Sequence, residues 1–166
     1  MANNHCTFST FLVARNQAER DWLAQQLEDR TDEESLRTLP RFLIDGRENP
    51  NTYDGMVQLG EDVDCAGFQW EFTTIAGQQG LWIHADEHGV PNNVAYLVQQ
   101  FRIAWQPEGC FGMGYAFTCD KPRVDEFGGG AFFVTATKEY WMDTYAFVDE
   151  HVSAHKPKDA EYRRNG

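Results

Sequence analysis

Alternating apolar and polar positions predict the clearest β-structure in the middle of the chain. Phe68, Trp70 and Phe72 alternate with polar residues, which is the period-two pattern of a strand with one face in water. A glycine-containing turn over 76–80 follows, and 81–85 is apolar enough to form the returning strand. The pattern therefore predicts a β-hairpin over 68–85.

A second pair of strands is predicted at 111–119 and 131–137, joined by a loop over 120–130. Pro122 and the run Gly128–Gly130 interrupt regular pairing within that loop. The glycine run could be interpreted as a phosphate-binding loop, but a strand and not a helix N-terminus follows it. We therefore interpret it as the entry to a strand where two backbones approach closely.

Apolar residues repeat with helical spacing in three further segments. A helix is predicted over 17–29, because Asn16 and Glu19 have the spacing of a capping box. Two more are predicted over 92–106 and 138–152. The residues expected to face the core in these two helices are Val94, Leu97, Val98, Phe101 and Trp105, then Trp141, Tyr145, Val148 and Val152.

The remaining N-terminal part is expected to contain a strand over 8–13, a short helix and a long loop. Thr31 and Glu34 repeat the capping spacing, and Pro40 should end the short helix that they introduce. The segment 45–60 is rich in Asp, Asn, Gly and Pro, which predicts a surface loop.

This order of elements predicts an α+β fold. Hairpins separated by helices favour a two-layer sandwich, in which helices pack on one face of a mostly antiparallel sheet. The C-terminal two-thirds should have the order ββαββα. At 166 residues the chain is long enough for one domain, expected over 1–152, and the polar segment 153–166 is expected to fray.

Charge, apolar content and cysteine pattern limit the compartments and the classes of partner that are expected. The chain has 14 Lys and Arg against 26 Asp and Glu, a net charge of −12, which disfavours direct binding to nucleic acid or to an anionic membrane. There is no signal peptide pattern and no apolar run near the ~18 residues of a membrane span, so a soluble cytoplasmic protein is expected. The cysteines Cys6, Cys65, Cys110 and Cys119 form no C-x-x-C pair, which favours reduced thiols and no bound cofactor.

The acidic residues are unevenly distributed, because no Lys or Arg occurs between Arg47 and Arg102. A folded surface without local neutralisation carries a negative field that attracts basic surfaces. The carboxylates predicted to bind the basic surface of a protein or ribonucleoprotein complex are Glu61, Asp62, Asp64, Asp86 and Glu87. The alternative is that this acidity serves only solubility.

One segment matches a metalloenzyme pattern. His84, Glu87 and His88 fit H-x-x-E-H, in which two histidines on one helix face bind zinc and the glutamate acts on the bound water. A metal-dependent hydrolase is therefore the alternative function. The context argues against it, because 81–83 is predicted as a strand and Gly89 as part of a turn.

Two weaker alternatives also remain. Cys119 lies at a predicted strand end beside Lys121 and Arg123, where a thiolate nucleophile could be stabilised, although an inert buried thiol is the simpler interpretation. A small molecule could also bind between the helices and the sheet, or near the loop 120–130.

The segment 68–137 resembles small acidic proteins of bacteria, phages and plasmids. The resemblance rests on Leu81-Trp82-Ile83, the acidic turn Asp86-Glu87, the helix 94–101, Cys119-Asp120-Lys121-Pro122-Arg123 and Phe127-Gly128-Gly129-Gly130-Ala131. It implies a bacterial or mobile-element setting, in which small acidic proteins block host defences that handle nucleic acid. The expected function is thus a non-enzymatic protein-binding module, and more narrowly an inhibitor of anti-CRISPR or antirestriction type.

Overall fold

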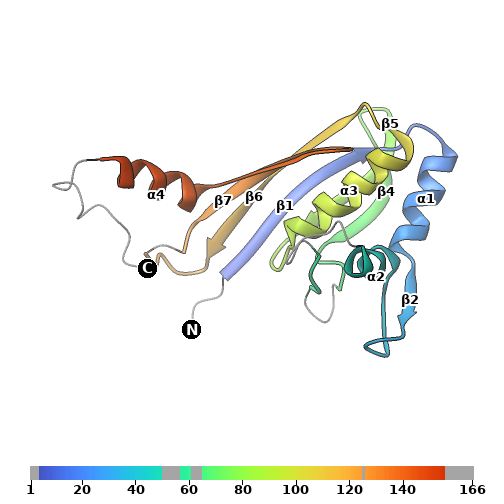
Figure 1. Ribbon diagram of the computed structural model, residues 1–166, viewed down its shortest axis with the longest axis horizontal. Helices are drawn as coiled ribbons and strands as arrows, with labels where there is room; N and C mark the ends of the chain where they lie inside the picture. Colours follow the sequence, from blue (N-terminus) through green and yellow to red (C-terminus); the bar gives the residue numbers. More distant parts are fainter. Residues whose placement is uncertain (1–3, 50–56, 61–64, 125, 156–166) are drawn as a thin grey trace.

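The computed structural model describes residues 4–49, 57–60, 65–124 and 126–155. Its central feature is a six-stranded antiparallel sheet with the strand order β4-β5-β1-β6-β7-β8 (Figure 1). The predicted α+β class is confirmed. The strands are β1 (Asn4–Val13), β4 (Gln69–Ile75), β5 (Gln78–Ala85), β6 (Cys110–Cys119), β7 (Gly128–Thr135) and β8 (Glu139–Asp143).

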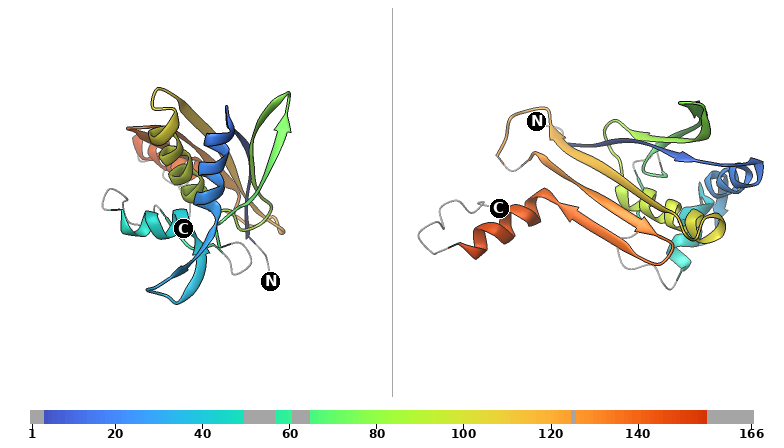
Figure 2. Two further views of the ribbon diagram at one scale, coloured as in Figure 1. Left: turned by 90° about the vertical axis from the view of Figure 1, so that its right-hand side faces the viewer. Right: turned by 90° about the horizontal axis from the view of Figure 1, so that it is seen from above.

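Helices α1 (Gln17–Leu27), α2 (Arg41–Glu48) and α3 (Pro91–Trp105) gather against one face of the sheet, at one end of it (Figures 1 and 2). Helix α3 lies over β6 and β7. The apolar residues predicted to face the core of α3 do so, since Val94, Leu97, Val98 and Phe101 are fully buried. They pack in one cluster with the inward side chains of the strands, among them Leu12, Leu81, Ile83 and Val134. We call the described residues before 139, which include these three helices, the body.

Helix α1 begins where the capping pattern predicts. The backbone N–H of Glu19 donates to Asn16 Oδ1 at 3.0 Å. The Glu19 side chain does not return to the cap, however, but accepts from the N–H and Nε of Arg15 at 2.5 and 2.8 Å and from Gln106 Nε2 at 3.3 Å. Burial raises the pKa of the Glu19 carboxyl, but these hydrogen bonds outweigh it and the net pKa is lowered. The carboxylate thereby ties the start of α1 to the end of α3.

The short helix predicted from Thr31 and Glu34 is wrong. The segment forms the hairpin β2 (Asp29–Asp32) and β3 (Arg37–Pro40). The capping spacing was misleading because Asp32 accepts from the N–H and hydroxyl of Ser35 and closes the turn, and pairs with Arg47 at 2.7 Å. Pro40 precedes α2 and does not end a helix. Residues 45–48, the first part of the predicted loop 45–60, belong to α2. Residues 50–56 of that loop lie outside the described residues.

The predicted helix 138–152 is also wrong in its first part. Residues 139–143 form β8, which pairs with β7, and helix α4 (Thr144–Ala154) begins only after Asp143. Trp141 packs 5.2 Å from the Phe132 ring across the two strands, so sheet pairing decides its position. The observed order in the C-terminal two-thirds is therefore ββαβββα. Helix α4 ends two residues past the predicted domain boundary, and 156–166 of the predicted tail lie outside the described residues.

We call β8 and α4, residues 139–154, the arm. The helix of the arm extends beyond the end of the sheet, away from α1, α2 and α3 (Figure 1). Every residue of α4 is described and none of them is buried. The face predicted to cover the core through Tyr145, Val148 and Val152 therefore contacts no core. No helix within the described ranges is both long and apolar enough to cross a membrane.

Candidate functional site

The predicted acidic residues fall into two groups. Asp86 and Glu87 are exposed in the loop after β5, whereas Glu61, Asp62 and Asp64 lie outside the described residues. The loop is held beside β1, because the Cys6 N–H donates to the Glu87 carbonyl at 2.6 Å and the Gly89 N–H donates to the Cys6 carbonyl at 3.0 Å. The Glu87 side chain thus extends from a backbone that is fixed to the sheet.

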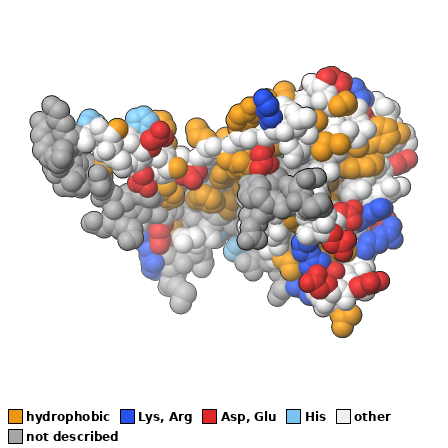
Figure 3. Space-filling view, viewed as in Figure 1, with side chains coloured by type: hydrophobic (Ala, Val, Ile, Leu, Met, Phe, Trp, Pro, Cys, Tyr) orange, Lys and Arg blue, Asp and Glu red, His pale blue; other side chains and the backbone are white. Residues whose placement is uncertain are grey.

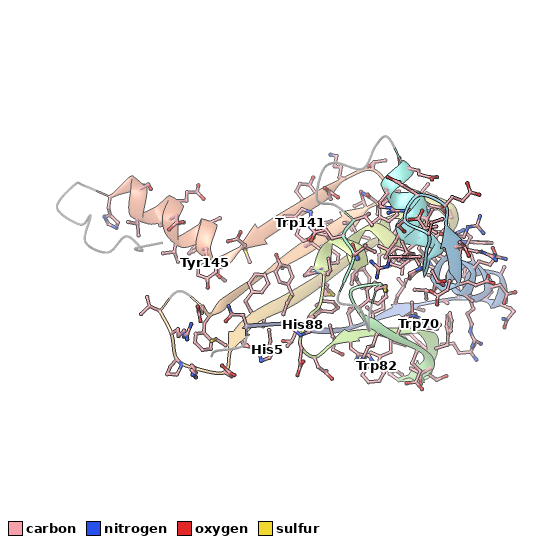
Figure 4. The ribbon with its side chains drawn as sticks, turned by 90° about the horizontal axis from the view of Figure 1, so that it is seen from below. His5, Trp70, Trp82, His88, Trp141 and Tyr145 are labelled. Carbon is pink, nitrogen blue, oxygen red and sulfur yellow. The ribbon has the colours of Figure 1, made fainter. Side chains whose placement is uncertain are left out.

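The three residues of the metalloenzyme pattern do not form a metal site. His84 belongs to β5, where its ring stacks on Trp82 with 3.9 Å between centroids. His88 lies past the end of that strand, 6.4 Å from the ring of His5 (Figure 4). In residues 4–49, 57–60, 65–124 and 126–155, no group of three or more His, Cys, Asp or Glu could hold a metal ion. The helix that H-x-x-E-H requires is absent here, because 84–85 are strand.

A pocket of about 580 Å³ lies where the body meets the arm. Its size is within the range of pockets that enclose small ligands. Five separate stretches of chain and the first turn of α4 form its walls, and none of the described residues that line it is Lys or Arg. The lining residues are Asn4, His5, Cys6, Leu59, Gly60, Glu87, His88, Gly89, Val90, Phe117, Thr118, Glu126 and Tyr145.

The aromatic wall of the pocket is held in place by the start of β7. The Tyr145 hydroxyl donates to the Phe127 carbonyl at 2.6 Å. Gly128 allows the ring to lie close, because a Cβ there would be 3.1 Å from Tyr145 Cε2 and 2.6 Å from Thr144 Oγ1. Gly129 has a similar role on the other side of the strand, where a Cβ would be 2.3 Å from the Tyr115 carbonyl oxygen. The glycine run is thus a strand entry with close backbone approach, but the predicted interruption of pairing is wrong, because residues 128–130 pair with β6. Gly128 and the Phe127 carbonyl position Tyr145.

Glu126 supplies a partly covered carboxylate. Its Oε2 accepts from the Cys119 thiol at 3.1 Å, and its Oε1 lies 3.9 Å from the Arg123 guanidinium. The Lys121 N–H lowers the pKa of the Cys119 thiol, but burial and Glu126 outweigh it, so the net pKa is raised. Burial raises the pKa of Cys6 to about 11. A raised pKa disfavours the thiolate, so this environment does not favour the nucleophile considered for Cys119.

The arm adds an apolar surface next to the pocket. Tyr140 and Met142 on β8 are each 56% exposed, and Phe147 on α4 is 55% exposed. Hydrophobic side chains also appear in the hollow between the two lobes of the molecule (Figure 3). The arm carries the acidic residues Glu139, Asp143, Asp149 and Glu150 and contains no Lys or Arg. In the body, by contrast, arginines pair with carboxylates at Arg15–Glu19, Arg30–Glu28, Arg41–Asp45 and Arg47–Asp32.

Comparison with protein-family models, with curated proteins and with solved structures finds no match. The function is therefore inferred from this chain alone. Sequence reasoning placed Glu87 and His88 among the candidates, but it did not group His5, Phe117 and Tyr145 with them in one site. These residues are far apart in the sequence and share no spacing, so only the fold brings together the start of β1, the end of β6 and the start of α4. The loop 120–130, suggested as a place for a ligand, contributes Glu126.

Proposed function

We propose that the protein is a non-enzymatic binding module that engages the basic surface of another protein or of a ribonucleoprotein complex. The observation that carries the proposal is the arm. A helix with no buried residue exposes Phe147 and Val148, next to a strand that exposes Tyr140 and Met142. Large apolar side chains that gather on the surface of a domain are typical of protein interfaces.

The charge around the arm favours a partner of opposite sign. Carboxylates flank the apolar residues without any Lys or Arg in 139–154, and the acidic loop with Asp86 and Glu87 meets the arm across the pocket. Rim carboxylates raise the rate of encounter with a basic surface, while the apolar side chains supply the buried contact. The narrower prediction, a host-defence complex that handles nucleic acid, rests on the resemblance and stays a prediction.

The test is affinity capture from a lysate of the source cells at low and high salt, with mass spectrometry of the retained proteins. The arm variant combines Phe147→Ser with Val148→Ser, and the charge variant combines Asp86→Lys with Glu87→Lys. Matched controls on the body are Ile103→Ser, which is 51% exposed on α3, and Glu33→Lys with Glu34→Lys on the β2–β3 hairpin. A third variant reverses Glu61, Asp62 and Asp64 together.

We expect the wild type and both controls to retain a basic partner at low salt and to release it at high salt. The arm variant and the charge variant should not retain this partner. With the purified partner, the arm variant should bind at least about tenfold more weakly, since central apolar contacts carry most of the energy of an interface. Recovery of the same proteins by the wild type and by all three variants would refute the proposal. Loss with the third variant alone would move the contact to 61–64.

A further inference from the structure

The pocket between the body and the arm combines negative charge with aromatic walls. Glu87 and Glu126 supply two carboxylates, and the rings of His5, Phe117 and Tyr145 supply flat surfaces. A guanidinium group suits both, because it is planar, donates hydrogen bonds to carboxylates and stacks on rings. An ammonium group lacks the flat face, and an anion would meet carboxylates with no Lys or Arg in the described lining.

The carboxylates remain able to accept a further cation. The contact of Glu126 with Arg123 is 3.9 Å long, and the Arg123 side chain is 51% exposed, so this ion pair is weak. Cys119 donates a single hydrogen bond to Oε2, and a carboxylate accepts several. Glu87 is 63% exposed, with the His88 imidazole 3.7 Å away. An incoming guanidinium would therefore displace little that is already bound.

The aromatic surfaces are already in place. Tyr145 is held by its hydrogen bond to the Phe127 carbonyl and by contact with Gly128. Phe117 packs edge-on against Tyr115 with 5.5 Å between centroids. In Figure 4, His5 and His88 lie together near the start of β1, and Tyr145 lies opposite at the start of α4. Walls that are ordered before binding reduce the entropic cost of closing on a ligand.

We propose that this pocket binds the guanidinium group of an arginine side chain supplied by the basic partner. The inference rests on the proposed function, and it adds the place and the side-chain chemistry of the contact. The arginine enters between the acidic loop of the body and α4 of the arm. The apolar stem of its side chain lies along Phe117 and Tyr145, and its planar group meets Glu87 and Glu126.

The test requires no partner. Purified, isotopically labelled protein is titrated with N-acetyl-arginine-methylamide, and the neutral isostere N-acetyl-citrulline-methylamide is the matched control. Binding is followed by the amide and imidazole signals of the pocket residues His5, His88 and Thr118. We expect saturable shifts confined to the pocket with the arginine compound, and at least tenfold weaker binding of the citrulline compound.

Variants make the test specific. Glu126→Gln should weaken the arginine compound about tenfold, because a charge-assisted hydrogen bond becomes a neutral one. Arg123→Gln should strengthen binding, because it removes the cation that competes for the same carboxylate. Glu87→Gln, at an exposed position, weakens binding without a risk to folding, and an unchanged melting temperature checks each variant.

Equal binding of the two compounds would overturn the inference and indicate a pocket for uncharged ligands. Shifts that never saturate and spread over the surface carboxylates would overturn it as well. Its failure is distinct from that of the proposed function. If the pocket binds neither compound while the arm variant still loses the partner, the arginine site is refuted and the proposed function is not. If the arginine compound binds and the arm variant keeps every captured protein, the proposed function is refuted and the cation site is supported.

Discussion

Helices α3 and α4 show how differently the two ends of the molecule use similar sequence patterns. Both helices carry apolar residues at helical spacing. In α3 this face is closed by the sheet and by the neighbouring helices, and Phe101 is 0% exposed. In α4 no residue is buried, and Val148 on the corresponding face is 43% exposed. Apolar periodicity thus identifies a surface that is suited to burial, but it does not say which molecule buries it.

The same contrast separates stability from function. Segments with few buried contacts open at low free energy, and binding elements are often drawn from them. In the body, arginines pair with carboxylates at Arg15–Glu19 and Arg47–Asp32, whereas the arm combines exposed rings with carboxylates and has no Lys or Arg. We therefore expect the body to determine the stability of the fold and the arm to determine what it binds.

The largest expected difference between α3 and α4 is the effect of truncating one phenylalanine in each helix. Phe101→Ala should lower the free energy of unfolding by about 3–5 kcal/mol, because it leaves a cavity in the core. Phe147→Ala should change it by no more than about 0.5 kcal/mol. Urea unfolding followed by circular dichroism measures both. If Phe101→Ala does not fold, Phe101→Leu should lower the free energy of unfolding by a smaller amount. Equal losses of this free energy for the Phe101 and Phe147 variants would show that the arm belongs to the core.

A second comparison uses two helix caps of the same geometry. Asn16 Oδ1 accepts the Glu19 N–H at 3.0 Å, and Asp143 Oδ1 accepts the Ala146 N–H at 2.7 Å. Asn16→Ala should lower the free energy of unfolding of the whole domain by about 1 kcal/mol, since α1 packs on the core. Asp143→Ala should leave that free energy nearly unchanged and speed amide hydrogen exchange within α4 only. A global loss from Asp143→Ala would contradict the independence of the arm.

The smallest effect concerns acid stability of the body. The hydrogen bond from Ser35, followed by the contact with Arg47, holds the pKa of Asp32 at about 2, below its ordinary value of 3.8. The folded state therefore favours the ionised carboxylate. The stability that this provides is present above about pH 4 and is lost as the pH falls toward 2. Asp32→Asn should lower stability at neutral pH and flatten the unfolding profile between pH 4 and 2.

A conservative variant sharpens the acid experiment. Ser35→Ala removes the largest cause of the lowered pKa and keeps the Arg47 contact. It should keep the acid-dependent loss of stability but move it to higher pH, whereas Asp32→Asn removes that loss. Thermal unfolding at a series of pH values measures both variants, and identical profiles for the wild type and Asp32→Asn would rule out this role of the carboxylate.

Local pattern was sufficient where a segment's own residues select its structure. The β4–β5 hairpin follows from alternation, α3 from apolar spacing with Pro91 in its first turn, and α1 from its Asn16 cap. Prediction from local pattern failed where contacts with residues distant in the sequence select the structure of a segment. Asp32 closes a hairpin turn and pairs with Arg47 in α2, so the first predicted helix is a hairpin. Trp141 packs on Phe132 of β7, so the first part of the predicted helix 138–152 is a strand. The candidate site was predictable only for Glu87 and His88, which lie in one acidic turn.

The sequence by itself determined the α+β class, the start of α1, the position of α3 and the strong negative charge. These properties depend on interactions within a few residues or on composition, so they can be read along the chain. Tertiary structure alone decided that α4 stays uncovered, that 139–143 becomes an edge strand, and that His5, Glu87, Glu126 and Tyr145 share one pocket. The reason is physical: burial and cross-strand pairing depend on which distant segments meet, and that information is spread over the whole chain.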